Sequence, residues 1–250
     1  MEPSSHQGSI AKKVAFLAKT PLFANLWHKD LETLAVDFRL REYGKGDVVF
    51  HQGDDGRELY VVVQGKVRVF RTSPSGNETS ICIFSPCDVI GEFAPLDRLP
   101  RSATAKAIGP CVLLAMAGDT LLQHMRGMPD LAIGMTRLLA SKVRWTAAYA
   151  EAIAQYDAGG RLLHLLLLYN EQFGEEAEGG KRYVLDLSLN QSDLASMVGV
   201  SREWINRKMG QWREKGLIEY KAGKIVILDL PAVERERDRK IANHAREVEW

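Results

Sequence analysis

Short apolar runs that end at glycine or proline occupy residues 43–116. Residues 59–63 read LYVVV and stop before Gly65, and residues 67–70 read VRVF and stop before the turn sequence Pro74-Ser75-Gly76. Runs of this kind, rich in β-branched and aromatic residues and separated by turn residues, are typical of antiparallel strands joined by tight turns. We therefore expect a small antiparallel barrel or jelly roll in this part of the chain.

Helical patterns lie on both sides of these strands. Apolar residues recur at spacings of three and four from Phe16 to Leu40, which predicts short amphipathic helices. A longer helical pattern covers residues 130–156, with Gly134 as its weak point. One seam can pack on the barrel, whereas two seams favour a second helix from another copy of the chain. The two seams are Leu138, Lys142, Trp145, Tyr149, Ala152 and Tyr156, and Leu139, Val143, Thr146, Ala150 and Ile153.

Residues 190–209, NQSDLASMVGVSREWINRKM, have the pattern of two short helices joined by a tight turn. Leu194 and Val198 give the first helix an apolar face, Gly199 permits the turn, and Ser201 can cap the second helix. A glycine pair at residues 159–160 precedes this region and marks the expected domain boundary. The motif predicts a helix-turn-helix.

A local basic patch coincides with the second helix of this motif. The whole chain has a formal net charge of only +1, but residues 202–224 hold seven cations against three anions. Two apolar runs at residues 217–220 and 225–228 predict a β-hairpin directly behind, so a DNA-binding winged helix is favoured over a helical hairpin with a basic solvated face. The expected DNA-binding residues are Ser201, Arg202, Glu203, Asn206, Arg207 and Lys208.

Two separated motifs resemble the cyclic AMP receptor protein and fumarate-nitrate regulator (CRP/FNR) family of bacterial transcription regulators. They are Gly91-Glu92-Phe93-Ala94 followed by Arg101-Ser102-Ala103-Thr104, and Ser201-Arg202-Glu203 with Arg207. The resemblance covers nearly the whole chain and implies an α+β fold: an antiparallel β jelly roll, a long dimerisation helix and a C-terminal winged helix-turn-helix. We accordingly expect a flexible N-terminus at 1–15, an effector-binding barrel with N-terminal helices at 16–129, the dimerisation helix at 130–157, the DNA-binding domain at 158–230 and a charged tail at 231–250.

The first motif resembles the phosphate-binding cassette of the cyclic-nucleotide branch of that family. A cyclic phosphate inside a barrel is a desolvated anion, and Arg101 and Ser102 offer it a bidentate cation and a hydroxyl. Glu92 can accept a hydrogen bond from a ribose hydroxyl, and the resemblance places Thr146 against the adenine ring. Cyclic AMP is therefore the expected effector. The expected effector-site residues are Gly91, Glu92, Phe93, Arg101, Ser102 and Thr146.

Two departures from the family pattern leave the effector open. Ala147 stands where a cyclic AMP receptor often has a serine, and Pro95 can alter the short helix that presents amides to the phosphate. The alternatives are cyclic GMP, a cyclic dinucleotide, or no effector at all. Without an effector, the barrel would serve only as a scaffold for the dimer. Arg101 would then make an ordinary surface ion pair, for example with Asp97, and Glu92 a structural turn contact.

Other chemistries of a small barrel find less support in the sequence. A haem sensor would have to use Cys87, His51 or His124. An iron-sulfur sensor needs clustered N-terminal cysteines, but no cysteine precedes Cys82. A cupin-like enzyme needs clustered histidines with a carboxylate. We therefore expect no enzyme, no catalytic residue and no metal site.

For DNA, the resemblance places Arg202, Glu203 and Arg207 at base-reading positions and implies TGTGA-like half-sites. These half-sites form an inverted repeat, because a two-fold dimer presents two recognition helices about one helical turn apart. Asn206 replaces a small residue of the family, so one or two bases of the site can differ. The expected partners are double-stranded DNA, a second copy of the chain and RNA polymerase, the last through an acidic loop at residues 174–180.

The cysteines and the hydropathy of the chain indicate where it acts. Three cysteines without CxxC spacing fit free thiols in a reducing cytoplasm better than a disulfide framework or a zinc site. The longest apolar run, residues 162–169, is far shorter than the roughly 20 residues that cross a bilayer. We therefore expect a cytoplasmic protein with no membrane span.

Overall fold

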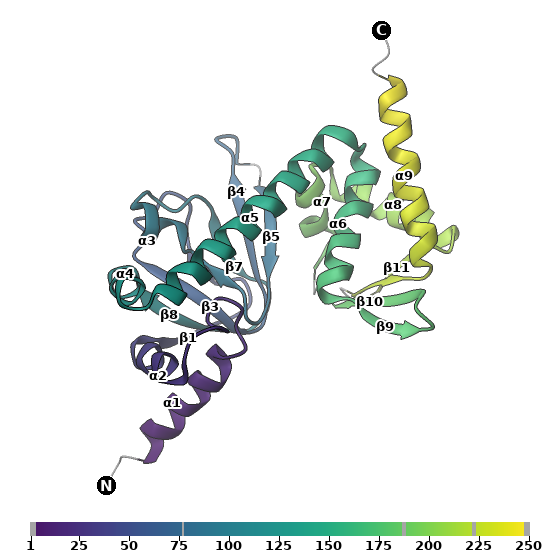
Figure 1. Ribbon diagram of the computed structural model, residues 1–250. Helices are drawn as coiled ribbons and strands as arrows, with labels where there is room; N and C mark the ends of the chain where they lie inside the picture. The colour runs from purple at the N-terminus through teal and green to yellow at the C-terminus, as the bar shows by residue number, and fades with distance from the viewer. Residues whose placement is uncertain (1–3, 77, 187–188, 222–223, 248–250) are drawn as a thin grey trace. The chain divides into compact units, whose positions relative to one another are not determined.

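The computed structural model describes residues 4–76, 78–186, 189–221 and 224–247. It divides into two compact units, Met1–Val143 and Arg144–Trp250 (Figure 1). The first unit holds the predicted strands and the second holds the predicted helix-turn-helix. The boundary between the two units falls inside the long helix α5 (Pro129–Gln155). The domain boundary at the glycine pair 159–160 stays a prediction.

Two four-stranded antiparallel sheets form the barrel of the first unit, as the sequence predicts (Figure 1). The first sheet, in spatial order, contains β1 (Arg39–Tyr43), β8 (Cys111–Ala117), β3 (Glu58–Gln64) and β6 (Val89–Ile90). The second contains β2 (Val48–Phe50), β7 (Thr104–Ala107), β4 (Val67–Thr72) and β5 (Glu78–Phe84).

Strand β3 is buried on both faces, which explains its unbroken apolar run. Leu59 and Val61 belong to the core beneath the helices, whereas Tyr60 and Val62 belong to the core between the two sheets. Alternate side chains of a strand point to opposite faces, so a strand covered on both sides is apolar throughout. The turn at Gly65, with a φ of +84°, carries the chain from one sheet to the other, so β3 and β4 are not hydrogen-bonded to each other.

Helices cover the outer face of the first sheet. They are α1 (Ser4–Leu17), α2 (His28–Asp37), α4 (Gly118–Gly127) and the first part of α5, while α3 (Phe93–Asp97) follows β6. Within the described residues, the segment predicted to be flexible at 1–15 is helical from Ser4 on, and α1 buries Val14 and Leu17 in the helix-side core. Leu131 and Met135 anchor the first part of α5 in the same core.

The second unit packs helices against a small antiparallel sheet. Its helices are α6 (Ala158–Phe173), α7 (Gln191–Val198), α8 (Arg202–Glu214) and α9 (Leu230–Glu247). Its strands, in the spatial order of the sheet, are β11 (Ile218–Lys221), β12 (Lys224–Ile227), β10 (Arg182–Asp186) and β9 (Glu175–Glu178). The predicted hairpin behind the second helix of the motif is β11 and β12. Residues 174–180, expected to be a loop, instead contain strand β9, which pairs with β10.

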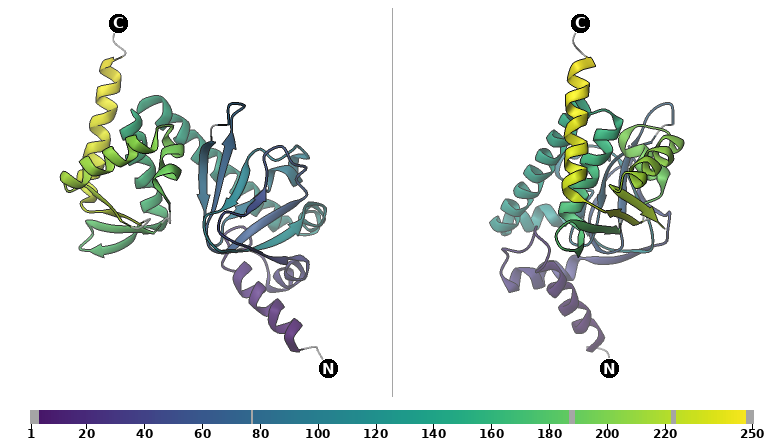
Figure 2. Two further views of the ribbon diagram at one scale, coloured as in Figure 1. Left: turned by 180° about the vertical axis from the view of Figure 1, so that it is seen from behind. Right: turned by 90° about the vertical axis from the view of Figure 1, so that its right-hand side faces the viewer.

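Helix α9 shows that the C-terminal region is not a free charged tail. It lies alongside α6 (Figure 2), with Val233 fully buried and Glu236 nearly so. Lys240 forms an ion pair of 3.2 Å with Asp157, the residue that caps the start of α6. A Cβ at Gly160 would lie 2.9 Å from Lys240 Cβ, so this glycine permits close packing of α6 and α9.

The remaining expectations concern free thiols, metal-binding groups and membrane-spanning helices. All three cysteines are free, with Cys111 buried and Cys82 and Cys87 half-buried. Among the residues that the structure describes, no three His, Cys, Asp or Glu side chains are grouped in a way that could bind a metal ion. None of the helices in the described ranges has the length and hydropathy of a membrane-spanning segment.

Candidate effector site and DNA-binding helix

A tight turn between β6 and α3 holds the first part of the predicted cassette. Gly91 adopts a φ of +75°, a conformation that a residue with a Cβ rarely takes. The next residue, Glu92, occupies the N-cap position of α3 without a side-chain capping hydrogen bond and is only 1% exposed. Pro95 is the third residue of α3, inside the first turn, where a proline is tolerated because the amide there has no partner within the helix. The short helix therefore forms despite the proline.

Arg101 is buried beside this turn and is not a surface residue. Its Nη1 donates to the carbonyl oxygen of Gly91 and its Nη2 donates to that of Glu58, 2.6 Å away. Its guanidinium lies 4.2 Å from the centre of the Phe50 ring. Burial lowers the pKa of the guanidinium from its usual value. Arg101 makes no ion pair with Asp97, whose carboxylate accepts from the amide of Leu99 instead, so the surface ion-pair alternative is wrong.

Two glycines make room for the Arg101 side chain. A Cβ at Gly56 would lie 2.8 Å from Arg101 Nε, and a Cβ at Gly91 would lie 2.7 Å from Arg101 Nη1. Contacts this short do not occur in folded proteins without displacement of one group. The cassette therefore depends on a glycine from the loop before β3 as well as on the predicted one after β6.

Two buried polar atoms at this site have no hydrogen-bond partner. They are Arg101 Nε and Glu92 Oε2. An unpaired buried donor or acceptor costs roughly 1–3 kcal/mol, so such atoms mark a place where a bound molecule can supply the missing partners. Arg101 Nε is a donor of the cationic guanidinium and fits an anion, and a free carboxylate oxygen fits a hydroxyl. The two groups together fit a molecule that carries both a phosphate and a sugar hydroxyl.

Lys142 joins the candidate site, although the sequence pattern placed it only in a helix seam. Its Nζ lies 2.7 Å from Glu92 Oε1 and 2.8 Å from the carbonyl oxygen of Val89. It also lies near the rings of Phe84 and Phe93, at 4.9 and 5.6 Å from their centres. Its position one helical turn before Thr146 was the available signal, but the pairing with Glu92 depends on how α5 crosses the barrel.

The remaining predicted effector residues are placed differently. Phe93 and Ser102 are exposed, in contrast to the buried pair Glu92 and Arg101. Thr146 is exposed on the part of α5 that belongs to the second unit, so its contact with an effector stays a prediction.

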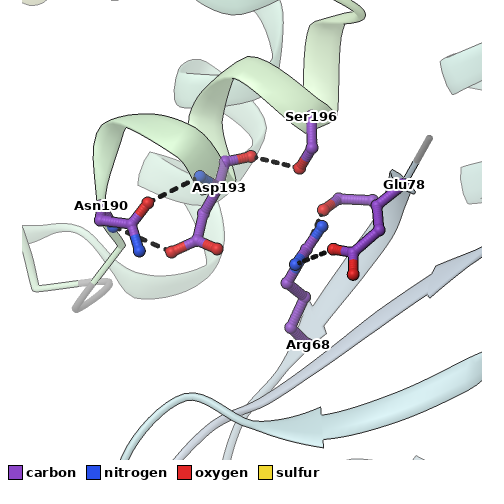
Figure 3. Close-up of polar contacts among 6 residues, drawn as sticks. Arg68, Glu78, Asn190, Asp193 and Ser196 are labelled. Atoms are coloured by element: carbon purple, nitrogen blue, oxygen red, sulfur yellow. Dashed lines mark hydrogen bonds and ion pairs between the residues drawn. The ribbon is translucent and has the colours of Figure 1, made fainter. Parts of the chain in front are cut away.

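The first helix of the predicted DNA-binding motif begins with a reciprocal pair of hydrogen bonds. The Asn190 side chain accepts from the amide of Asp193, and the Asp193 carboxylate accepts from the amide of Asn190 (Figure 3). The Ser196 hydroxyl also donates to the carbonyl oxygen of Asp193. This capping box satisfies two amides that a helix start would otherwise leave unpaired. Gly199 ends the helix in the left-handed conformation that the turn requires.

Helix α8 buries one side and exposes the other, as the motif predicts. Ser201 caps it by accepting from the amide of Trp204, and Ile205, Met209 and Trp212 are buried. The amide of Glu203 and the Ser201 hydroxyl lower the pKa of the Glu203 carboxyl, which favours its acceptor-only anionic form. The exposed residues include five of the predicted set, namely Ser201, Arg202, Glu203, Asn206 and Arg207.

Lys208 does not lie with this exposed group. It is half-buried, and its Nζ is 5.5 Å from the Trp212 ring and 6.0 Å from the Trp204 ring. A Cβ at Gly159 would lie 3.3 Å from Lys208 Cε, so the side chain extends toward the start of α6. Burial, followed by the charge of Lys240, lowers its pKa. The neighbouring Arg207 stays exposed, so the two adjacent cations lie in different surroundings.

The two compact units also match two known domain families. Residues 40–127 match the cyclic nucleotide-binding domain, and residues 160–236 match the Crp-like helix-turn-helix domain. The chain belongs to the CRP/FNR family. This CRP/FNR protein is a DNA-binding transcription regulator with a cyclic nucleotide-binding domain.

Similar proteins cover nearly the whole chain. The CRP-like cAMP-activated global transcriptional regulator of Mycobacterium tuberculosis is 28% identical over 85% of this chain and 94% of its own length. The cyclic AMP receptor protein of Thermus thermophilus is 29% identical over 86% of this chain and 95% of its own. A crystal structure of a CRP/FNR-family transcriptional regulator from Thermus thermophilus superposes with a TM-score of 0.61 at 26% identity, covering 81% of this chain and 100% of that one.

Proposed function

We propose that this CRP/FNR protein acts as a homodimer that binds cyclic AMP in its barrel and then binds inverted repeats with TGTGA-like half-sites. The observation that carries the effector assignment is the pair of unpartnered buried atoms, Glu92 Oε2 and Arg101 Nε. They suit a ribose hydroxyl and a cyclic phosphate. The activator of the mycobacterial relative and the name of the Thermus relative support cyclic AMP as the nucleotide.

The surface of α5 supports the homodimer. Exposed or half-exposed residues, mostly small or apolar, alternate at spacings of three and four along it, which is the repeat of a coiled-coil seam. Val143 is 67% exposed and Ile133 47% exposed, an unfavourable state for large apolar side chains unless another surface covers them. The seam consists of Ile133, Thr136, Ala140, Val143, Ala147, Ala150 and Ala154.

The mechanism follows from the position of Lys142 on the same helix. Glu92, which would accept from the effector, already holds Lys142 and thereby attaches α5 to the cassette. A ribose hydroxyl at Glu92 changes the hydrogen bonding of that carboxylate, and α5 carries the change to the dimer seam. Two global states that the effector populates differently then present the recognition helices in different positions.

Further parts of the proposal rest on the family alone. RNA polymerase is the proposed protein partner, and the hairpin of β9 and β10 is its proposed contact. A regulator that binds bacterial DNA acts in the cytoplasm, and no enzymatic activity is assigned to the chain.

The second candidate is a regulator of the same family that needs no effector. It is favoured by the hydrogen bonds that Arg101 and Glu92 already make within the chain, to Gly91, Glu58 and Lys142. In this case the barrel serves only to hold α5 and the dimer.

Titration calorimetry with cyclic AMP, cyclic GMP and cyclic di-GMP separates the two candidates. We expect saturable binding of cyclic AMP and a loss of at least about tenfold in affinity in Arg101→Ala, because a charge-assisted hydrogen bond contributes roughly 1.5–3 kcal/mol. Arg71→Ala, which removes an exposed cation from β4, is the matched control and should bind as the parent does. Binding heat with another of these nucleotides, and none with cyclic AMP, would reassign the effector.

A gel-shift titration with an inverted-repeat duplex completes the test. Operator binding that strengthens with cyclic AMP supports the first candidate. Equal operator binding with and without every nucleotide, together with no heat in the calorimeter, supports the second.

A further inference from the structure

A hydrogen bond joins the two helices of the DNA-binding motif on its exposed side. Gln191, the first residue of α7, donates through Nε2 to Oδ1 of Asn206 on α8, at 3.2 Å. Asn206 is exposed and Gln191 is half-buried. Asn206 is therefore not a freely rotating surface amide, since one of its two ends is occupied by a neighbour.

The backbone positions of Gln191 and Asn206 are both fixed by neighbouring residues. Gln191 directly follows Asn190, and the capping box between Asn190 and Asp193 fixes the first turn of α7 (Figure 3). Asn206 directly follows Ile205, which is fully buried under α8. The two amides consequently meet in an arrangement that is set before DNA arrives.

The bond decides which chemical group Asn206 presents. With Oδ1 accepting from Gln191, the amide nitrogen Nδ2 is turned outward, and no hydrogen bond from Nδ2 is found among the described residues. Nδ2 is a donor, whereas Oδ1 is an acceptor. Asn206 lies one turn from Glu203 and next to Arg207, on the exposed side of α8.

We propose that Gln191 is a positioning residue that makes Asn206 a hydrogen-bond donor toward one base of the operator. The inference rests on the proposed function, in which α8 enters the major groove. There the acceptors are purine N7, guanine O6 and thymine O4, whereas cytosine offers only its N4 amino donor. Asn206 therefore accepts purines or thymine at the base it faces and rejects cytosine, because two donors would meet.

An asparagine amide held in this way discriminates between bases more strongly than one that rotates freely. A free amide can rotate by half a turn and offer either Nδ2 or Oδ1, so it accommodates both acceptor and donor edges. Gln191 removes this freedom. The discrimination against cytosine thus depends on a residue that does not itself need to contact a base.

Selection from a duplex library tests the proposal. The full-length protein, with cyclic AMP and separately without nucleotide, is used to enrich inverted repeats with randomised half-sites, and base frequencies are counted. The base position that Asn206 reads is the one whose preference disappears in Asn206→Ala. In the parent protein we expect cytosine to be depleted there about five- to tenfold, in line with the roughly 1–3 kcal/mol that a good base contact contributes.

Two variants of Gln191 give opposite expectations. Gln191→Met keeps the shape but cannot donate, so the depletion of cytosine should fall to about twofold or less. Gln191→Glu can only accept, so Asn206 Nδ2 must turn toward it and Oδ1 must face the base. Cytosine should then be enriched over thymine and guanine at that position, while adenine, which offers both N7 and N6, changes little.

Gln211→Met and Gln211→Glu are the matched controls. Gln211 is exposed on the same helix and contacts Lys208, so its variants should leave the position read by Asn206 unchanged. Relative frequencies are compared because Gln191→Glu also adds a negative charge near DNA and lowers all affinities.

The experiment distinguishes failure of this inference from failure of the proposed function. If specific duplexes are enriched but the Gln191 variants keep the parental preferences, or if Asn206→Ala alters no position, this inference is overturned and the proposed function stands. Depletion of guanine and thymine in the parent would show the reversed amide and would also overturn it. Enrichment of no duplex in either condition overturns the proposed function and the inference together.

Discussion

Lys142 Nζ lies 2.7 Å from Oε1 of Glu92, and the carboxylate is almost completely buried. This ion pair joins α5 to the turn that carries the predicted effector cassette. Glu92 is thus shared between an internal partner, through Oε1, and an unpaired atom, Oε2, that an effector can use.

Breaking this pair should destabilise the barrel. Lys142→Met keeps most of the side-chain volume but leaves Glu92 as an unpaired buried carboxylate, an outcome that costs several kcal/mol when both partners are buried. Because Lys142 is 22% exposed, we expect a smaller loss of about 1–3 kcal/mol in the free energy of unfolding, measured by urea denaturation. Lys224→Met, which breaks the exposed ion pair with Asp186, is the control and should lose less than about 1 kcal/mol. Equal losses would contradict a special role for Lys142.

Two helical glycines should respond with opposite signs to replacement by alanine. A Cβ at Gly160 would lie 2.8 Å from the Tyr156 ring and 2.9 Å from Lys240 Cβ, whereas a Cβ at Gly210 in α8 meets nothing within 4 Å. Gly160→Ala should therefore lower the stability by about 1–3 kcal/mol through overpacking. Gly210→Ala should raise it by about 0.5–1 kcal/mol through helix propensity. Thermal unfolding of both variants gives the two signs, and stabilisation by Gly160→Ala would show that α6 and α9 are not closely packed there.

Arg207 and Lys208 are neighbours in sequence but should behave differently on DNA. Arg207→Ala removes an exposed cation from the predicted base-reading side and should weaken operator binding by about 1–3 kcal/mol while relaxing preference at one base. Lys208→Ala should leave the base preference unchanged, because that side chain extends toward α6. Competition gel shifts with single-base operator variants measure both. If Arg207→Ala loses affinity equally on random DNA, its base-reading role is wrong.

The sequence predicted those features that depend on local pattern. The apolar run of β3, the helices α7 and α8 with the Ser201 cap of α8, and the turn at Gly199 each follow from the spacing of neighbouring residues, and the structure contains them. Spacing does not reveal which sheet a strand joins. The passage of the chain at Gly65 from one sheet to the other was therefore not anticipated.

Site residues that depend on contacts between distant elements were missed for the same reason. Lys142 and Glu92 are 50 residues apart, and only the path of α5 over the barrel brings them together. Lys208 was grouped with Arg207 because both are basic, although only Arg207 is exposed and Lys208 extends toward the start of α6. The region of helix α9 was predicted as a charged tail because its charges dominate. Val233 and the partners of Lys240 and Glu236 can be identified only in the folded unit.

The exposed seam on α5 gives a direct test of the dimer. Val143→Glu places a charge in the middle of the proposed coiled coil, where it would be buried without a partner, so we expect a folded monomer with weaker operator binding. Sedimentation velocity measures the mass, and circular dichroism confirms that the chain is folded. Val36→Glu, at another exposed apolar residue, on α2, is the control and should remain a dimer. A dimeric Val143→Glu variant would place the interface elsewhere.

His164 should make the stability of the second unit depend on pH. Its ring stacks on Tyr156 at 5.3 Å, both ring nitrogens are buried without a partner, and burial, followed by the charge of Arg237, lowers its pKa. The other charges that act on it are Glu151 on α5 and Glu171 on α6, which oppose the shift. The folded protein therefore keeps this histidine neutral at a pH where the unfolded chain, with a pKa of about 6.5, already binds a proton.

The sign of the effect follows from proton binding. Below the unfolded pKa of about 6.5 the unfolded state holds more protons, so the free energy of unfolding falls as the pH falls, until the folded pKa is reached. The stability contributed by neutral His164 is thus complete above about pH 7 and decreases in more acidic solution. Urea denaturation of the parent and of His164→Phe, which keeps a ring against Tyr156, should give curves that diverge progressively below about pH 6.5, with the parent losing more stability. Parallel curves across this range would show that His164 is solvated or paired in the folded protein.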